Sequence, residues 1–208
     1  MPFIEYNGRN ILYIHVPKTG GTSVENWLET LAPLKFHVPG GLSAMRCTPQ
    51  HLQRDQFRVL FGEDYFEYSF MTVRNPFTRI ESEYRMRAAM GGRNFFKTFA
   101  NFSRWLENNI TQTQSNVYHL DNHIRPQWHF CGSGLQIFKL EEGLENIFST
   151  VASKIGAPKP QSTPHLLQTS KKEIPVTWDR VDILRVLEYY GQDFEEFGYS
   201  KEPPVTVY

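Results

Sequence analysis

Three short apolar runs, each followed by turn residues and then by a segment with helical periodicity, set the pattern of this chain. The runs are rich in β-branched and aromatic residues and read NILYIHV (10–16), YSFMTV (68–73) and LQIFKL (135–140). Such runs, bounded by polar or turn-forming residues, predict buried β-strands. Strands that alternate with helices favour a layered α/β domain whose sheet is largely parallel.

The segments between these strands predict helices, because their apolar residues recur every three or four positions. The helix predicted over 22–31 presents one apolar face made of Val24, Trp27, Leu28 and Leu31. The helix predicted over about 77–90 presents a stripe made of Phe77, Ile80, Tyr84 and Ala88. A further helix is predicted over 141–155.

Single residues predict several helix boundaries. Pro49 fits the first turn of a helix over about 49–61, and Gly91–Gly92 are expected to end the helix that follows YSFMTV. Asn94 is then predicted to cap another helix, and Asp179 to cap one or two helices near the C-terminus.

Composition narrows the class of protein. The 208 residues suit a single domain over 1–208 with a sizeable core. Lysine plus arginine equals aspartate plus glutamate at 22 each, which argues against a nucleic-acid binder. No apolar run approaches the ~20 residues of a membrane span and no signal peptide is evident, so a cytoplasmic location is expected. Cys47 and Cys131 do not make a disulfide framework, and whether they pair stays open.

The turn after the first strand, PKTGGTS (17–23), has the residues of an anion site. The helix that follows begins with backbone N–H groups without intrahelical partners and with a partial positive charge. The two glycines let an anion approach the backbone, Lys18 adds a full charge, and Thr22 and Ser23 add hydroxyl donors. These groups predict a phosphate or sulfate cradle; the alternative is a plain tight turn with a solvated lysine.

The order of residues in this turn differs from the nucleotide-triphosphatase loop, which reads G-x-x-x-x-G-K-[ST]. His15-Val16-Pro17 stands upstream where that loop has a glycine, and Lys18 precedes the glycines. No predicted strand ends in the acidic residue that would hold a magnesium ion. The YSFMTV strand is followed instead by Arg74, which suits a second anion. A P-loop nucleotide or small-molecule kinase is therefore the alternative interpretation.

A second motif, FMTVRNPFTRIESEY (70–84), supplies this second anion site. Arg74 follows the strand directly, and Ser82 stands eight positions later on the next predicted helix. A guanidinium fork matches a phosphate, and a hydroxyl supplements it. Taken alone, the pair is better explained by a strand-end salt bridge and an incidental serine, so the anion interpretation depends on the first motif.

With both motifs in place, the sequence resembles the sulfotransferases that use 3′-phosphoadenosine 5′-phosphosulfate (PAPS). It is most similar to the carbohydrate-type family that includes the heparan sulfate 2-O- and chondroitin sulfotransferases and many bacterial members. HVPKTGGTS resembles their 5′-phosphosulfate loop, and VRNPFTRIESEY resembles their 3′-phosphate motif. Weaker similarity in DNHIRPQ, FKLEEGLENIF and YYGQDFEEFGY extends the resemblance over nearly the whole chain.

This resemblance implies a fold, a donor and roles for individual residues. The fold is a P-loop-containing three-layer sandwich, with a central, mostly parallel sheet flanked by helices. Lys18 would contact the 5′-phosphosulfate and stabilise the leaving group, and Arg74 and Ser82 would hold the 3′-phosphate. The other donor-binding groups implied are the backbone of Thr19, Gly20 and Gly21 and the hydroxyls of Thr22 and Ser23. The product would be 3′,5′-adenosine bisphosphate, and the chemistry needs no metal.

The reaction implied is in-line transfer of a sulfuryl group to an acceptor hydroxyl of a small molecule or glycan, and it requires a base. Histidine titrates in the right range. His51 resembles the active-site histidine of family members and is the first candidate, with His37 as the competitor. His37 and His123 are also predicted to contact the acceptor, whereas His15 is expected to be structural.

The acceptor itself and the oligomeric state do not follow from the sequence. Four arginines between Arg79 and Arg93 favour attraction of an acidic glycan, but a solvated helix face balanced by nearby glutamates explains them equally well. A catalytically silent nucleotide-binding or scaffold protein is a further alternative, against which the intact set of Lys18, Arg74 and Ser82 counts.

Overall fold

A computed structural model describes residues 1–38, 40, 44–99, 101–160 and 174–203 of the chain. Two compact units make up the protein. The first combines Met1–Arg74 with His129–Leu167, and the second combines Asn75–Trp128 with Gln168–Tyr208. The expectation that 1–208 works as a single domain stays a prediction.

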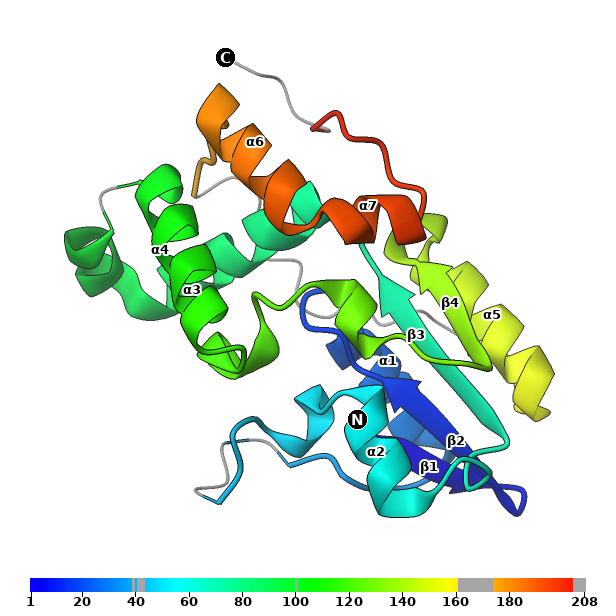
Figure 1. Cartoon of the computed structure of the whole chain (residues 1–208). Helices are drawn as coiled ribbons and strands as arrows, with labels where there is room; N and C mark the ends of the chain where they lie inside the picture. Colours follow the sequence, from blue (N-terminus) through cyan, green and yellow to red (C-terminus); the bar gives the residue numbers. More distant parts are fainter. Residues whose placement is uncertain (39, 41–43, 100, 161–173, 204–208) are drawn as a thin grey trace. The chain divides into compact units, whose positions relative to one another are not determined.

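A four-stranded sheet forms the centre of the first unit (Figure 1). Its strands, in spatial order, are β1 (Phe3–Tyr6), β2 (Arg9–Ile14), β3 (Tyr68–Val73) and β4 (Leu135–Lys139). β2 pairs in parallel with β3, and β3 pairs in parallel with β4. The three predicted strands are confirmed, and their parallel pairing brings their carboxyl ends to one edge of the sheet, where α/β proteins bind ligands.

Strand β1 is an element that the apolar pattern did not predict. It runs antiparallel to β2, and Tyr6 faces Arg9 across a two-residue turn. Asn7 and Gly8 in that turn have φ angles of 51° and 72°. Positive φ at both positions is the requirement of a type I′ hairpin, for which Asn-Gly is the preferred sequence. The signal for β1 was therefore present in YNGR.

Helices cover both faces of the sheet. On one face, α1 (Gly21–Leu31) and α5 (Leu144–Ile155) share an apolar core with the strands, and Trp27 stacks on Phe148 with ring centroids 4.7 Å apart. On the other, α2 (Arg54–Phe61) contributes Phe61, whose ring lies 5.6 Å from that of Phe3. Phe3 and Ile4 point to opposite faces because side chains alternate along a strand. Figure 1 shows α2 in front of the sheet and α1 behind it. The fold is thus mixed α/β, with a four-stranded sheet flanked by helices.

The single helix predicted over 49–61 is wrong. The chain instead forms a short 3₁₀ helix, η1 (Pro49–His51), followed by α2. Leu52 and Gln53 separate them with ψ angles of 157° each, which is extended rather than helical backbone. Gln53 then caps α2 together with Gln56. A second 3₁₀ helix, η4 (Leu140–Glu142), likewise precedes α5, where one helix over 141–155 was predicted.

The second unit is helical. Its main elements are α3 (Pro76–Thr98), α4 (Phe102–Ser115), η2 (His119–Asn122), α6 (Arg180–Tyr189) and α7 (Gly191–Glu196), and η3 (Gln127–Phe130) leads back to the first unit. The predicted stripe on α3 is buried and packs in a core with Trp105, Trp178 and Tyr190. Asp179 caps α6, as predicted, by accepting the N–H of Asp182. None of the helices in the described part of the chain combines the length and apolar character needed to span a membrane.

Helix α3 continues past its predicted end at Gly91–Gly92. Gly92 has non-helical angles (φ 51°, ψ −138°), but helical hydrogen bonding resumes and runs to Thr98. After this break, Phe95 packs back against Tyr84, with ring centroids 5.5 Å apart. The predicted cap at Asn94 is therefore wrong: Asn101 caps the next helix by accepting the N–H of Arg104 at 3.0 Å.

Candidate active site

The turn between β2 and α1 forms the centre of the candidate site, because it follows the carboxyl end of a parallel strand. Lys18 and Gly20 have φ angles of 71° and 89°, and Gly20 is the capping residue of α1. A non-glycine residue with such a φ is uncommon, and such residues concentrate at binding and catalytic sites. The turn therefore presents Lys18 and the N-terminus of α1 at the same edge of the sheet.

Both glycines of the turn are favoured by their surroundings: Gly20 by its positive φ and a close leucine, and Gly21 by tight packing against a histidine ring. A Cβ on Gly20 would lie 2.9 Å from Cδ1 of Leu140, and a Cβ on Gly21 would lie 2.1 Å from Nε2 of His15. Neither space can hold a methyl group unless the neighbour moves. The sequence suggested that the glycines admit an anion; the structure adds that Gly21 admits the imidazole of His15 beneath the start of α1.

Thr19 anchors the turn to the sheet. Its hydroxyl is fully buried, donates to the carbonyl of Val16 at 2.8 Å and lies 2.9 Å from the hydroxyl of Thr72 on β3. Thr72 in turn lies 2.8 Å from the hydroxyl of Tyr13 on β2, and burial raises the pKa of that phenol. The side chain of Thr19 is thus engaged within the protein, and the contact of its backbone with a donor, which the resemblance implies, stays a prediction.

Arg74 links the two motifs. It follows β3 directly, is half-buried, and its Nη1 donates to the carbonyl oxygen of Lys18 at 3.4 Å. The loops after β2 and β3 thus meet, as expected for neighbouring parallel strands. Two positively charged residues, predicted from separate stretches of sequence, therefore meet where these two loops come together.

The remaining predicted donor-binding residues differ in their surroundings. Thr22 is exposed on the first turn of α1, whereas Ser23 is 3% exposed. Ser82 lies on α3 in the second unit and is partly buried. Its predicted partnership with Arg74 at the 3′-phosphate stays a prediction.

Three of the histidines surround one carboxylate in the first unit. Nδ1 of His15 lies 2.5 Å from Oε1 of Glu25 on α1, and Nε2 of His37 lies 3.6 Å from Oε2 of the same residue. The ring of His51 meets that of His15 edge-on, with centroids 4.9 Å apart, and its Nδ1 lies 3.2 Å from the hydroxyl of Thr48. Both candidate bases therefore belong to one cluster, buried except for His37, which we call the Glu25 cluster (His15, Glu25, His37 and His51).

Glu25 is the residue of this cluster that the sequence analysis missed. It is 5% exposed, and burial by itself would raise the pKa of its carboxyl group. The charge and hydrogen bond of His15, with the charges of His37 and His51, outweigh burial and lower that pKa below its usual value. The only sequence signal was a charged residue beside the apolar stripe of α1; its pairing with a histidine ten positions earlier depends on the strand–turn–helix geometry.

His123, the predicted acceptor contact, belongs to a comparable arrangement in the second unit. Its Nδ1 lies 2.7 Å from Oε2 of Glu83, whose Oε1 accepts from Nε of Arg87 at 2.7 Å. Glu83 is fully buried, which alone would raise the pKa of its carboxyl group, but His123 and Arg87 lower it from 4.5 to about 2. Contact of His123 with an acceptor stays a prediction.

The arginines of α3 brace an unusual turn. Leu120, Asp121 and Asn122 have successive φ angles of 51°, 60° and 66°, a left-handed run that is unfavourable for residues other than glycine. Arg87 donates to the carbonyl of Leu120 at 3.5 Å, and Arg79 donates to that of His123 at 3.0 Å. Arg79 is also buried, while Arg85 and Arg87 pair with glutamates of their own helix. These three arginines therefore have structural partners, which reduces the case for a glycan-binding patch.

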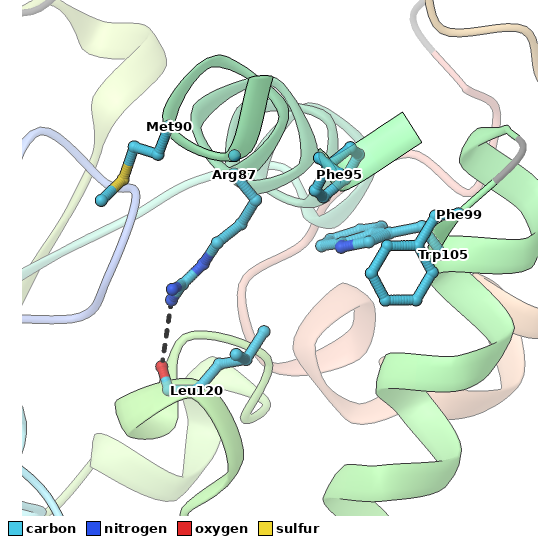
Figure 2. Close-up of a pocket in the computed structure, with 7 residues that line it drawn as sticks. Arg87, Met90, Phe95, Phe99, Trp105 and Leu120 are labelled. Atoms are coloured by element: carbon cyan, nitrogen blue, oxygen red, sulfur yellow. Dashed lines mark hydrogen bonds between the residues drawn. The ribbon is translucent and has the colours of Figure 1, made fainter. Parts of the chain in front are cut away.

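A cavity of about 300 Å³ lies in the second unit. Arg87 is one of the residues that line it, and Glu83 is not. Figure 2 shows Arg87 reaching across it to the Leu120 carbonyl, beside the rings of Phe99 and Trp105. Apart from the guanidinium, its lining is apolar and aromatic. It has the character of a site for an apolar group and contains none of the residues predicted to bind the donor.

Comparison with known proteins gives one match. The model of the sulfotransferase family matches residues 3–200, a span that includes both anion motifs and all of the histidines discussed above. No curated protein and no solved structure matches the chain.

Proposed function

The chain belongs to the sulfotransferase family, and on that premise we propose that it moves a sulfuryl group from PAPS to a hydroxyl group of a carbohydrate or small molecule. Membership makes the protein a transferase of sulfuryl groups. The identity of the donor, the class of acceptor and the roles of individual residues are our proposal.

The observation that carries the proposal is the hydrogen bond between Arg74 and the carbonyl of Lys18. It joins the two anion motifs at one edge of the sheet, beside the N-terminus of α1. A donor with a phosphosulfate at one end of its ribose and a phosphate at the 3′ position needs two such positive groups. The kinase alternative is not favoured, because Lys18 precedes the glycines and Arg74 stands where a magnesium-binding acid would be expected.

In the proposed reaction, an acceptor oxygen attacks the sulfur in line with the departing phosphate oxygen of PAPS. The S–O bond to that phosphate breaks as the new S–O bond forms, and 3′,5′-adenosine bisphosphate leaves. Negative charge grows on the leaving oxygen, where Lys18 and the first N–H groups of α1 stabilise it in preorganised form. Backbone groups of Thr19, Gly20 and Gly21, with the hydroxyls of Thr22 and Ser23, would hold the 5′ end.

Arg74 and Ser82 would bind the 3′-phosphate, which distinguishes PAPS from ATP. The guanidinium matches a phosphate in geometry and charge, and the hydroxyl of Ser82 adds a donor. The proposed chemistry requires no metal ion, since the positive charge comes from Lys18 and Arg74.

A histidine of the Glu25 cluster would take the acceptor proton. His51 is the first candidate from the resemblance, and it is 6% exposed. His37 is the second candidate, and 30% of its side chain is exposed. Exposure favours His37, because a base must reach the acceptor hydroxyl within hydrogen-bond distance. His37 and His123 are also the proposed contacts of the acceptor.

Thermal unfolding with added nucleotide tests the donor. We expect 3′,5′-adenosine bisphosphate, without magnesium, to raise the melting temperature of the wild-type protein, because a ligand of the folded state stabilises it by mass action. Arg74→Ala should lose this shift, whereas Arg104→Ala, at an exposed arginine of α4, should keep it. Stabilisation by ATP with magnesium but not by the bisphosphate would overturn the proposal.

A further inference from the structure

The carboxylate of Glu25 contacts two histidines from different parts of the chain. Its Oε1 lies 2.5 Å from Nδ1 of His15, at the end of β2, and its Oε2 lies 3.6 Å from Nε2 of His37, in the segment after α1. The side chains of Glu25 and His15 are 6% and 10% exposed, so water screens their interaction little.

The charged and titratable groups that interact with Glu25 come from three segments of the chain. They are His15 and Tyr13 from the β2 segment, His37 from the segment after α1, and His51 from η1. Within the described residues, the ionic partners of this carboxylate are histidines only, with no lysine or arginine among them. The charge balance of the cluster therefore depends on protons, and not on a permanent cation.

The contacts also define which ring nitrogens can exchange a proton. The lowered pKa of Glu25 keeps its carboxyl group ionised near neutral pH, so it can only accept hydrogen bonds. Nδ1 of His15 must then be the donor to Oε1. Nε2 of His37 faces Oε2 at 3.6 Å, which is an ion-pair distance rather than a hydrogen bond, and Nδ1 is the ring nitrogen that this contact leaves unengaged.

We propose that Glu25 is a positioning residue for the general base: it holds His37 directly and His51 through the ring of His15, and it stabilises the imidazolium that forms when the acceptor proton is taken. The proton moves from the acceptor hydroxyl to a ring nitrogen, and the carboxylate stays ionised throughout. This role rests on the proposed function, but the arrangement of the cluster does not.

Glu25→Gln tests the role, because glutamine keeps the shape and one acceptor oxygen but removes the charge. Glu29→Gln, at an exposed glutamate one turn later on α1, is the matched control. We expect Glu25→Gln to lower kcat at saturating PAPS at least about tenfold, as for a group that orients a catalytic base. The acidic limb of the kcat profile should move to lower pH, while the thermal shift given by 3′,5′-adenosine bisphosphate should not change.

A second measurement, chemical labelling of His37, tests the Glu25 cluster without requiring enzyme turnover. Diethyl pyrocarbonate acylates neutral imidazoles, so loss of the Glu25 charge should speed labelling of His37 several-fold, as measured by mass spectrometry of the folded protein. If Glu25→Gln does not fold, Glu25→Asp retains the charge but withdraws it from His37 and should give the same increase in labelling.

The two measurements separate the two hypotheses. Wild-type kcat and pH profile in Glu25→Gln, or unchanged labelling of His37, would overturn the positioning role. If the wild-type protein is not stabilised by 3′,5′-adenosine bisphosphate and transfers no sulfuryl group, the proposed function fails, and faster labelling of His37 would still support the arrangement of the cluster.

Discussion

Two buried glutamates, one in each unit, bind a histidine in the same way but differ in their other partner. Glu83 contacts His123 at 2.7 Å and also Arg87 at 2.7 Å. Glu25 contacts His15 at 2.5 Å, and its other ionic contact in the part of the chain that the structure describes is a second histidine, His37, at 3.6 Å. Arginine remains charged at every pH at which a protein is folded, whereas histidine loses its charge near neutral pH.

The second partner of each glutamate suggests its role: the Glu83 group is suited to holding the structure, and the Glu25 cluster is suited to proton transfer. Burial would raise the pKa of Glu83, but His123 and then Arg87 lower it, so a permanent cation contributes beside the histidine; Arg87 also braces the left-handed turn at Leu120. Within the described residues, the ion pairs of Glu25 are with His15 and His37 and include no permanent cation. Glu83 thus shares its charge between a histidine and an arginine that also holds a turn, whereas the contacts of Glu25 in the described residues are with histidines, which suits it to orient a general base.

The largest effect on stability is expected from Glu83→Gln. Removing one member of a buried ionic group leaves His123 and Arg87 without their counter-charge, so the free energy of unfolding should fall by about 3–5 kcal/mol. Urea denaturation at neutral pH measures this loss, with Glu107→Gln on an exposed glutamate of α4 as the control. A loss below about 1 kcal/mol would show that the Glu83 group does not hold the second unit together.

The stability of the protein at low pH should also depend on Glu83. The pKa of Glu83 is lowered from 4.5 to about 2 on folding, so its contribution is fully present above pH 4.5 and is lost as the pH falls toward 2. The wild-type protein should lose on the order of 3 kcal/mol from this residue over that window. Glu83→Gln should lose correspondingly less between those pH values when unfolding is followed in urea. Equal losses in the two proteins would contradict the lowered pKa.

Smaller effects on stability, but larger ones on turnover, are expected for the two candidate bases. His51→Ala removes a buried ring and should destabilise by about 2 kcal/mol, whereas His37→Ala removes a partly exposed one and should change stability by less than about 0.5 kcal/mol. At saturating PAPS, loss of the true base should lower kcat by about 10²–10⁴. A collapse of turnover in His37→Ala alone would transfer the role from His51 to His37, and a collapse in neither would remove both.

The sequence predicted the parts of the site that depend on local order. β2, β3 and β4 follow from apolar runs with few competing interpretations, and parallel pairing then brings Lys18 and Arg74 to one edge of the sheet. The buried stripe of α3 followed from helical spacing in the same way. These features need only the periodicity of strands and helices and the position of one turn.

The parts that were missed depend on contacts between distant residues or on single-residue geometry. The pairing of Glu25 with His37 joins two segments whose separation gives no periodic signal. Gly92 kinks α3 without ending it, since packing of Phe95 on Tyr84 favours continuation over the break that two glycines suggest. The hairpin at Asn7-Gly8 is an exception, because an Asn-Gly pair is by itself a local signal for this turn.

Transfer of labelled sulfate from PAPS by the wild-type protein and by Lys18→Ala tests the central claim most directly, with a panel of carbohydrate and small-molecule hydroxyls as acceptors. Lys18 is held with a φ of 71° on the turn that Arg74 contacts, where the leaving oxygen should develop its charge. We predict transfer by the wild-type protein and by an exposed-lysine control, Lys159→Ala, and a loss of about 10²-fold or more in Lys18→Ala with its melting temperature unchanged. Equal transfer by Lys18→Ala and wild type would contradict the account.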